Sequence, residues 1–114
     1  MRETFREILS PLLLDDGVAF VGIYRVDGVA IFAGIKRRGV LNILDWLEEQ
    51  VKLLLNYIES STFEDLEVKI SNYRLFLQPL SRSLVLAVLA SETASLYKLR
   101  IDISTVRRRF GEHG

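Results

Sequence analysis

The chain has 114 residues, of which 49% are hydrophobic and 26% charged, which fits one folded domain spanning 1–114 and excludes a disordered chain. Fifteen basic residues balance fifteen acidic ones, so no overall field favours nucleic acid or an anionic lipid surface. The sequence has no cysteine, and its single histidine is His113, which excludes thiol chemistry and leaves only a frayed chain end for histidine-based metal or acid–base chemistry.

The N-terminal third of the sequence predicts a helix followed by a β-hairpin. Apolar residues recur at helical spacing over residues 3–14, but Pro11 should kink or break this helix just before it, because proline lacks a backbone donor and restricts the preceding residue. Residues 18–26 and 29–35 are rich in β-branched and aromatic types. The Asp-Gly pair at 27–28 tolerates the backbone of a tight hairpin turn, so the two runs predict paired strands.

The sequence over residues 40–59 predicts one long helix with two apolar faces. At about 100° per residue, most of its aliphatic side chains fall on one face about 120° wide, which is typical of a helix packed on a core. Trp46, Leu53 and Tyr57 cluster about 100° from the centre of that face, with Gln50 between the two. This second face predicts a protein interface; the alternative is that its aromatic residues pack under a loop or against strands of their own chain.

The C-terminal half predicts three strands and a helix. Residues 65–71 alternate between apolar and polar, as in a half-exposed edge or near-edge strand. Residues 73–79 predict another strand, and the continuous apolar run 84–90 predicts a central one. Residues 94–110 show both strand and helix periods, and the length of the segment favours a helix. The expected order of elements is therefore α-β-β-α-β-β-β-α.

The sequence carries no motif of nucleotide binding or catalysis. The P-loop pattern G-x-x-x-x-G-K-[ST] is absent, so the chain is not itself a P-loop GTPase, and G-x-G-x-x-G is absent too. No activated nucleophile, metal-ligand set or converging acid–base pair is recognisable. We therefore expect no enzyme activity, no catalytic residues, no cofactor and no metal.

Two further features concern location and partners. The most continuous apolar stretch, SLVLAVLA at 83–90, is far shorter than the roughly 20 residues that span a bilayer, and the N-terminal sequence lacks the apolar core of a signal peptide, so we expect a cytoplasmic protein without a membrane span. Two basic clusters, at 36–38 and 107–109, either bind phosphates, acidic loops of a partner or a nucleic-acid backbone, or only aid solubility and complement helix dipoles.

Three stretches of the sequence together resemble the Roadblock/dynein light chain family. They are the hairpin GVAFVGIYRVDGVAIFAG at 17–34, the segment SLVLAVLASETASLYKLRID at 83–102, and the long amphipathic helix between them. The resemblance extends over nearly the whole chain. It implies an α+β domain of profilin-like architecture: a five-stranded antiparallel sheet with the middle helix on one face and the terminal helices on the other.

The resemblance also implies a function. Members of the family are dimers in which the middle helices lie side by side and the third strands pair edge to edge, and they act as platforms or regulators for small Ras-like GTPases. We therefore expect a non-enzymatic homodimeric adaptor or regulator that binds a small Ras-like GTPase; nucleic acid is not an expected partner. The alternative is a profilin-like or PAS-like sensory module with a small-ligand pocket between sheet and helix.

These expectations assign residues to two surfaces. The residues expected at the dimer interface come from the second face of the middle helix and from the third strand: Ile43, Trp46, Gln50, Leu53, Tyr57, Glu67, Val68 and Lys69. The residues expected to contact another partner are the first basic cluster, Lys36, Arg37 and Arg38.

Overall fold

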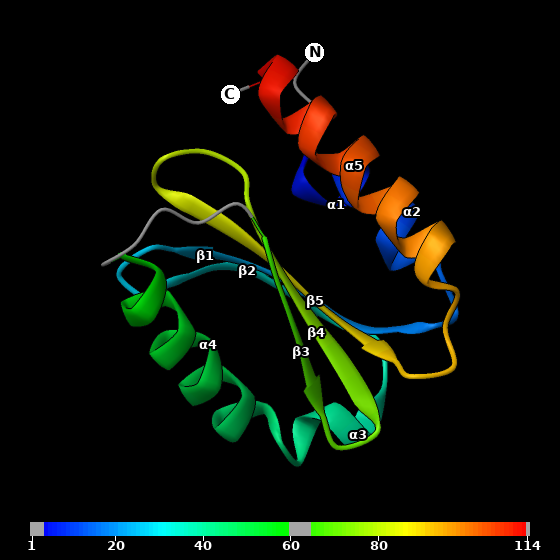
Figure 1. The fold of residues 1–114 in the computed structure, drawn as a ribbon. Helices are drawn as coiled ribbons and strands as arrows, with labels where there is room; N and C mark the ends of the chain where they lie inside the picture. The colour runs from blue at the N-terminus through cyan, green and yellow to red at the C-terminus, as the bar shows by residue number, and fades with distance from the viewer. Residues whose placement is uncertain (1–3, 60–64, 114) are drawn as a thin grey trace.

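A computed structural model describes residues 4–59 and 65–113, apart from the side chains of 57–59 and 112–113. These residues form one antiparallel sheet of five strands with helices on both faces (Figure 1). The expected α+β architecture is confirmed. The elements in chain order are α1 (Phe5–Ile8), α2 (Ser10–Leu13), β1 (Val18–Arg25), β2 (Ala30–Ile35), α3 (Arg38–Leu41), α4 (Leu44–Glu59), β3 (Leu66–Ile70), β4 (Tyr73–Pro79), β5 (Leu84–Ser91) and α5 (Leu96–His113).

The strand order is β2-β1-β5-β4-β3, which puts β2 and β3 at the two edges of the sheet. The central strand β5 pairs with β1 and β4 and is buried over nearly its whole length, as its continuous apolar sequence predicts. The residues of both edge strands are exposed or half-buried, apart from Gly34 of β2, which is buried. The edges are the two places where the sheet is open to another strand.

Two hydrophobic cores lie on opposite faces of the sheet. Because successive side chains of a strand point to opposite faces, Val21 and Ile23 of β1 pack with α1, α2 and α5, whereas Phe20 and Tyr24 pack with α3 and α4. The terminal helices therefore share one layer and the middle helices form the other, as Figure 1 shows.

The break expected in the first helix is confirmed. Two short helices, α1 and α2, meet at the fully buried Leu9, and Pro11 lies in the first turn of α2, where its missing N–H is harmless. Thr4 caps α1: its hydroxyl accepts a hydrogen bond from the Glu7 N–H at 3.2 Å.

The middle helix is divided, and the prediction of one continuous helix over residues 40–59 is wrong in this respect. α3 ends at Leu41, and the Ile43 N–H donates to the Val40 carbonyl at 3.0 Å. This i→i+3 bond is tighter than that of an α-helix, and it separates α3 from α4. None of the described helices combines the length and the hydropathy of a membrane-spanning segment.

Candidate self-association and partner-binding surfaces

The helix α4 buries one face and exposes an apolar flank. Leu47, Val51 and Leu55 are at most 1% exposed and pack on the sheet. Trp46 and Leu53, which are seven residues apart and therefore on the same side of the helix, are 47% and 61% exposed. Two of the three residues of the predicted second apolar face, Trp46 and Leu53, are therefore exposed to water.

The exposed flank lies on the side of α4 away from the β1–β2 hairpin. A Cβ atom built on Gly28, in the hairpin turn, would lie 3.0 Å from Cγ of Lys52, so the charged side of α4, with Glu48 and Lys52, faces the hairpin. Leu53 projects from the other flank, and Trp46 lies between that flank and the outer side of the helix, where it borders Glu49 and Lys52. We call Trp46, Gln50 and Leu53 the α4 flank.

The α4 flank faces the edge of the sheet that β3 forms. Leu66 and Ile70 of β3 pack against the same core as Leu54 of α4. Val68 lies opposite Leu75, a residue of that core, and is half-buried. Trp46, Gln50 and Leu53 therefore lie on the same face of the molecule as Val68, next to an open strand edge.

The other two β3 residues predicted at the interface point to the α5 side of the sheet. The Glu67 carboxylate accepts hydrogen bonds from Arg74 at 3.1 Å and from Arg100 at 3.5 Å, and Lys69 lies 3.7 Å from Glu92 in an exposed ion pair. Both residues stay at the edge of the sheet, but they are not on the face of Trp46.

The remaining two predicted interface residues are placed as follows. Ile43 is half-buried in the turn between α3 and α4. Tyr57 belongs to α4, but its side chain lies outside the described residues.

The predicted partner-binding residues follow β2, at the opposite edge of the sheet from β3. Lys36 donates through Nζ to the main-chain carbonyl of Asp15, and Arg37 donates through Nη2 to that of Asp16 at 2.6 Å. Partial burial lowers the pKa of Lys36, although the nearby carboxylates of Asp15 and Asp16 oppose this shift. Arg38 is exposed in the first turn of α3. The cluster is therefore a positioned basic surface beside the end of β2.

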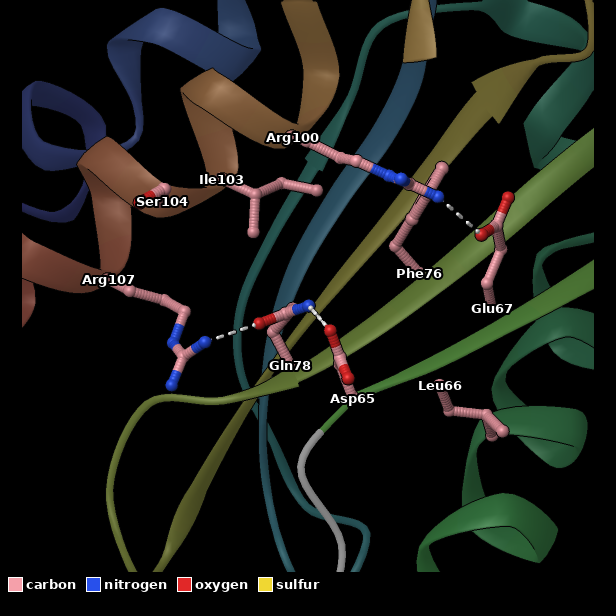
Figure 2. Close-up of a pocket in the computed structure, with 9 residues that line it drawn as sticks. All are labelled: Asp65, Leu66, Glu67, Phe76, Gln78, Arg100, Ile103, Ser104 and Arg107. Atoms are coloured by element: carbon pink, nitrogen blue, oxygen red, sulfur yellow. Dashed lines mark hydrogen bonds and ion pairs between the residues drawn. The ribbon is translucent and has the colours of Figure 1, made fainter. Parts of the chain in front are cut away.

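A groove of about 520 Å³ lies between α5 and the strands β3 and β4, with the apolar side chains of Phe76 and Ile103 among its lining (Figure 2). Its polar residues bond to one another across it: Arg107 donates to the Gln78 Oε1 at 2.9 Å, and the Gln78 Nε2 donates to Asp65 at 3.0 Å. The polar and charged side chains that line the groove therefore bond to one another, and these bonds join α5 to the sheet.

The space between the sheet and α4 is filled by apolar side chains. Among the described residues, the buried side chains of this layer are hydrophobic, and the polar atom that they bring into the core is the Tyr24 hydroxyl, which has no hydrogen-bond partner. A small-ligand site needs a few converging polar groups in its cavity, and a single hydroxyl does not supply them. The described part of the chain also contains no group of three His, Cys, Asp or Glu side chains that could hold a metal ion. The geometry therefore favours surface interactions.

The sequence analysis did not single out the edge strand β2. Ile31 and Ile35 are 40% and 38% exposed, and the strand contains no charged residue. The composition of residues 29–35 indicates a strand, but it does not distinguish an uncovered edge from a buried strand. The absence of any charged residue over 29–35 was the one sequence feature that could have indicated an unprotected edge strand.

Solved structures share this architecture at low sequence identity. MglB of Myxococcus xanthus matches with a TM-score of 0.72 and 15% identity, covering 96% of each chain. MglC of the same organism matches with 0.69 and 17%, covering 92% of this chain and 98% of that one. A Roadblock/LC7 domain from Streptomyces avermitilis matches with 0.69 and 13%, covering 94% of each. The fold is therefore that of a Roadblock/LC7 domain.

Sequence comparison gives the family. The AF0774-like protein family matches residues 2–104, and this chain belongs to it. No curated protein matches the sequence.

Proposed function

We propose that this protein is a non-enzymatic homodimeric adaptor or regulator that binds a small Ras-like GTPase. The observation that carries the proposal is the α4 flank, where Trp46 and Leu53 are 47% and 61% exposed. Apolar side chains exposed together on one flank mark an interface, and a twofold axis beside the flank would let two copies cover it mutually.

The open edge of β3 supports the same dimer. A strand edge next to the α4 flank can pair with the same edge of a second copy, so the helix contact and the strand contact would form together. One solved structure that shares the fold is described as MglB with tetrameric arrangement, which supports self-association by this architecture.

The GTPase part of the proposal rests on the Roadblock resemblance and on the basic cluster. Lys36, Arg37 and Arg38 would bind acidic loops of the GTPase, since cations held near an interface attract and orient such loops. The hydrogen bonds from Lys36 and Arg37 to main-chain carbonyls hold two of these side chains in place.

Size-exclusion chromatography with light scattering at micromolar concentration tests the dimer. We expect a mass of twice the 13.1 kDa chain, and a shift of Trp46→Glu towards the monomer, because the new carboxylate would be buried without a partner. Tyr97→Glu is the matched control, since Tyr97 is 78% exposed on α5 in the other layer. A monomeric wild type, or a Trp46→Glu variant that dimerises with unchanged affinity, contradicts the proposal.

Calorimetric titration with a purified Ras-like P-loop GTPase encoded beside this chain tests the partner. We expect binding that differs between the GDP and GTP-analogue states and that is about ten-fold weaker for Arg38→Glu. Arg108→Glu, at an exposed position on α5, is the control and should bind as wild type. If Arg38→Glu binds the GTPase as tightly as Arg108→Glu does, the basic cluster is not part of the interface. If the wild type binds neither the GDP state nor the GTP-analogue state, the proposed GTPase partner is wrong.

A further inference from the structure

The outer edge of β2 presents unpaired backbone groups. The Lys36 N–H donates to the Ala19 carbonyl of β1 at 2.9 Å, and in an antiparallel pair the bonded residues alternate along the strand. Residues 32 and 34 therefore also bond β1, whereas the N–H and C=O groups of Ala33 and Ile35 point away from it. Because β2 is the end of the strand order, these groups face water or an added strand.

The side chains along this edge offer nothing that opposes strand addition. Ala33 and Ile35 lie opposite Gly22 and Phe20 and so point to the α4 side of the sheet, where both are exposed. Edge strands are usually protected by lysine, proline or inward-pointing charges, and residues 29–35 contain none of these. The other face of β2 is supported by the terminal helices, since Phe32 packs against that core.

Cations outnumber carboxylates beside the C-terminal end of β2. Residues 28–41 contain Lys36, Arg37 and Arg38 and no acidic residue, although the carboxylates of Asp15 and Asp16 lie near Lys36. Lys36 and Arg37 are tied to the loop between α2 and β1 through the carbonyls of Asp15 and Asp16. The C-terminal end of β2 therefore lies next to a fixed positive surface, while its N-terminal part is apolar.

We propose that β2 accepts an extended segment of a partner protein as a sixth, antiparallel strand, with apolar residues at alternate positions and acidic residues at its N-terminal end. Antiparallel addition places the beginning of that segment beside Lys36–Arg38, where its carboxylates meet the cations, and main-chain bonds to Ala33 and Ile35 supply the register. The inference goes beyond the proposed function in its use of the β2 edge, which the dimer leaves open, and it draws on the same cations, Lys36–Arg38, as the proposed GTPase contact.

A second copy of this chain fits the β2 edge less well than a partner segment does. If β3 edges pair in the dimer, pairing of β2 edges as well would join one dimer to the next. The result would be an open-ended chain of dimers in place of a closed assembly. A partner segment ends the sheet instead, and its acidic residues complement the basic cluster.

Fluorescence anisotropy with a labelled synthetic peptide tests the proposal. The probe has three acidic residues followed by alternating valine and threonine, and the comparison peptide has the same residues with the acidic ones at its C-terminus. We expect the first peptide to bind about ten-fold more tightly than the second. In hydrogen exchange, the amides of Ala33 and Ile35 should become protected on binding, and those of β3 should not.

Variants at Ala33 separate strand addition from contact with the cations. Ala33→Pro removes the outward N–H without removing a bond to β1, and it should weaken the first peptide about ten-fold. Ala33→Val keeps the N–H and should bind as wild type. Ile35→Pro, which removes the other outward N–H of β2, gives the same answer if the Ala33 proline variant does not fold.

Three outcomes would overturn the proposal. They are unchanged binding by Ala33→Pro and Ile35→Pro, protection of the β3 amides in place of Ala33 and Ile35, and failure of the wild type to bind the first peptide. Self-association of the wild type that Ala33→Lys abolishes, with no peptide present, would assign the edge to a second copy and would also overturn it.

Discussion

At the scale of single residues, the turn between β3 and β4 shows what a local sequence leaves open. Asn72 marks the turn in the sequence, because asparagine tolerates turn backbone, and the turn forms at Ser71 and Asn72. The positive φ of 54° falls on Ser71, a residue type that pays a steric cost in this region. The position of the turn follows from the sequence, whereas the residue that carries the strain follows from the strand register.

We expect Ser71→Gly to raise the free energy of unfolding by about 0.5 kcal/mol, because glycine adopts a positive φ without steric cost, although it gains more entropy in the unfolded chain. Urea unfolding measures the effect. Asn72→Gly is the control, because Asn72 does not have a positive φ, so glycine there only adds entropy to the unfolded chain and should be destabilising. A Ser71→Gly variant no more stable than Asn72→Gly would contradict this explanation.

For the predicted interface residues too, the sequence indicated which residues are apolar, whereas the tertiary structure decided where they lie. The helical spacing of Trp46 and Leu53 sufficed to predict a second apolar side of the middle helix. That this side is exposed and adjoins β3 required the packing of Leu47, Val51 and Leu55 on the sheet, because the orientation of a helix depends on what its core face meets.

At the scale of elements, the link between α2 and β1 is joined to α5 through Asp15. Its carboxylate accepts from the Gly17 N–H at 2.8 Å and from the Lys98 ammonium at 3.0 Å. Partial burial by itself raises the pKa of Asp15, but the Gly17 hydrogen bond and the positive charge of Lys98 outweigh it, so the pKa lies below its ordinary value. The charged form of Asp15 therefore stabilises the folded state.

The pH dependence follows from that direction. The stabilisation by Asp15 is complete above the ordinary carboxyl pKa of the unfolded chain and is lost as the pH falls through the lower pKa of the folded state. We expect Asp15→Asn to lower the free energy of unfolding by about 1 kcal/mol at pH 7, and the difference from wild type to shrink as the pH falls below the ordinary carboxyl pKa of about 4.

Urea unfolding at several pH values measures this difference. Asp16→Asn changes an exposed carboxylate in the same loop and should leave stability nearly unchanged at every pH. A difference between Asp15→Asn and wild type that is as large at low pH as at neutral pH would show that Asp15 acts through packing alone.

The middle helix is the element on which local reasoning failed. Periodicity over residues 40–59 detected the apolar stripe but not the break, because the i→i+3 bond between Val40 and Ile43 keeps the side chains near the same face. Val40 belongs to the same buried core as Leu47, so the stripe continues through the break. A short change of helix type is therefore invisible to a pattern of apolar residues.

At the scale of the whole molecule, self-association should appear in the thermal stability. If two copies bury the α4 flank, the folded dimer gains about 1.4 kcal/mol for each tenfold rise in protein concentration, and the melting temperature rises with it. We expect Leu53→Glu to abolish this dependence, since the charge would be unpaired in the interface.

Differential scanning fluorimetry over a hundred-fold concentration range would check this prediction. Ile101→Glu, on the exposed side of α5, is the matched control and should keep the concentration dependence of the wild type. A melting temperature that does not vary with wild-type concentration would contradict dimerisation through the α4 flank.

The sequence by itself determined the kinds of elements and their order, because the apolar periods of strands and helices and the turn residues between them are local properties. Only the tertiary structure decided that β2 and β3 form the edges, that the cluster at Lys36–Arg38 adjoins β2, and that Trp46 and Leu53 stay in water. These features depend on which strands pair and which faces two helix layers cover, and such contacts join residues that are distant in the chain.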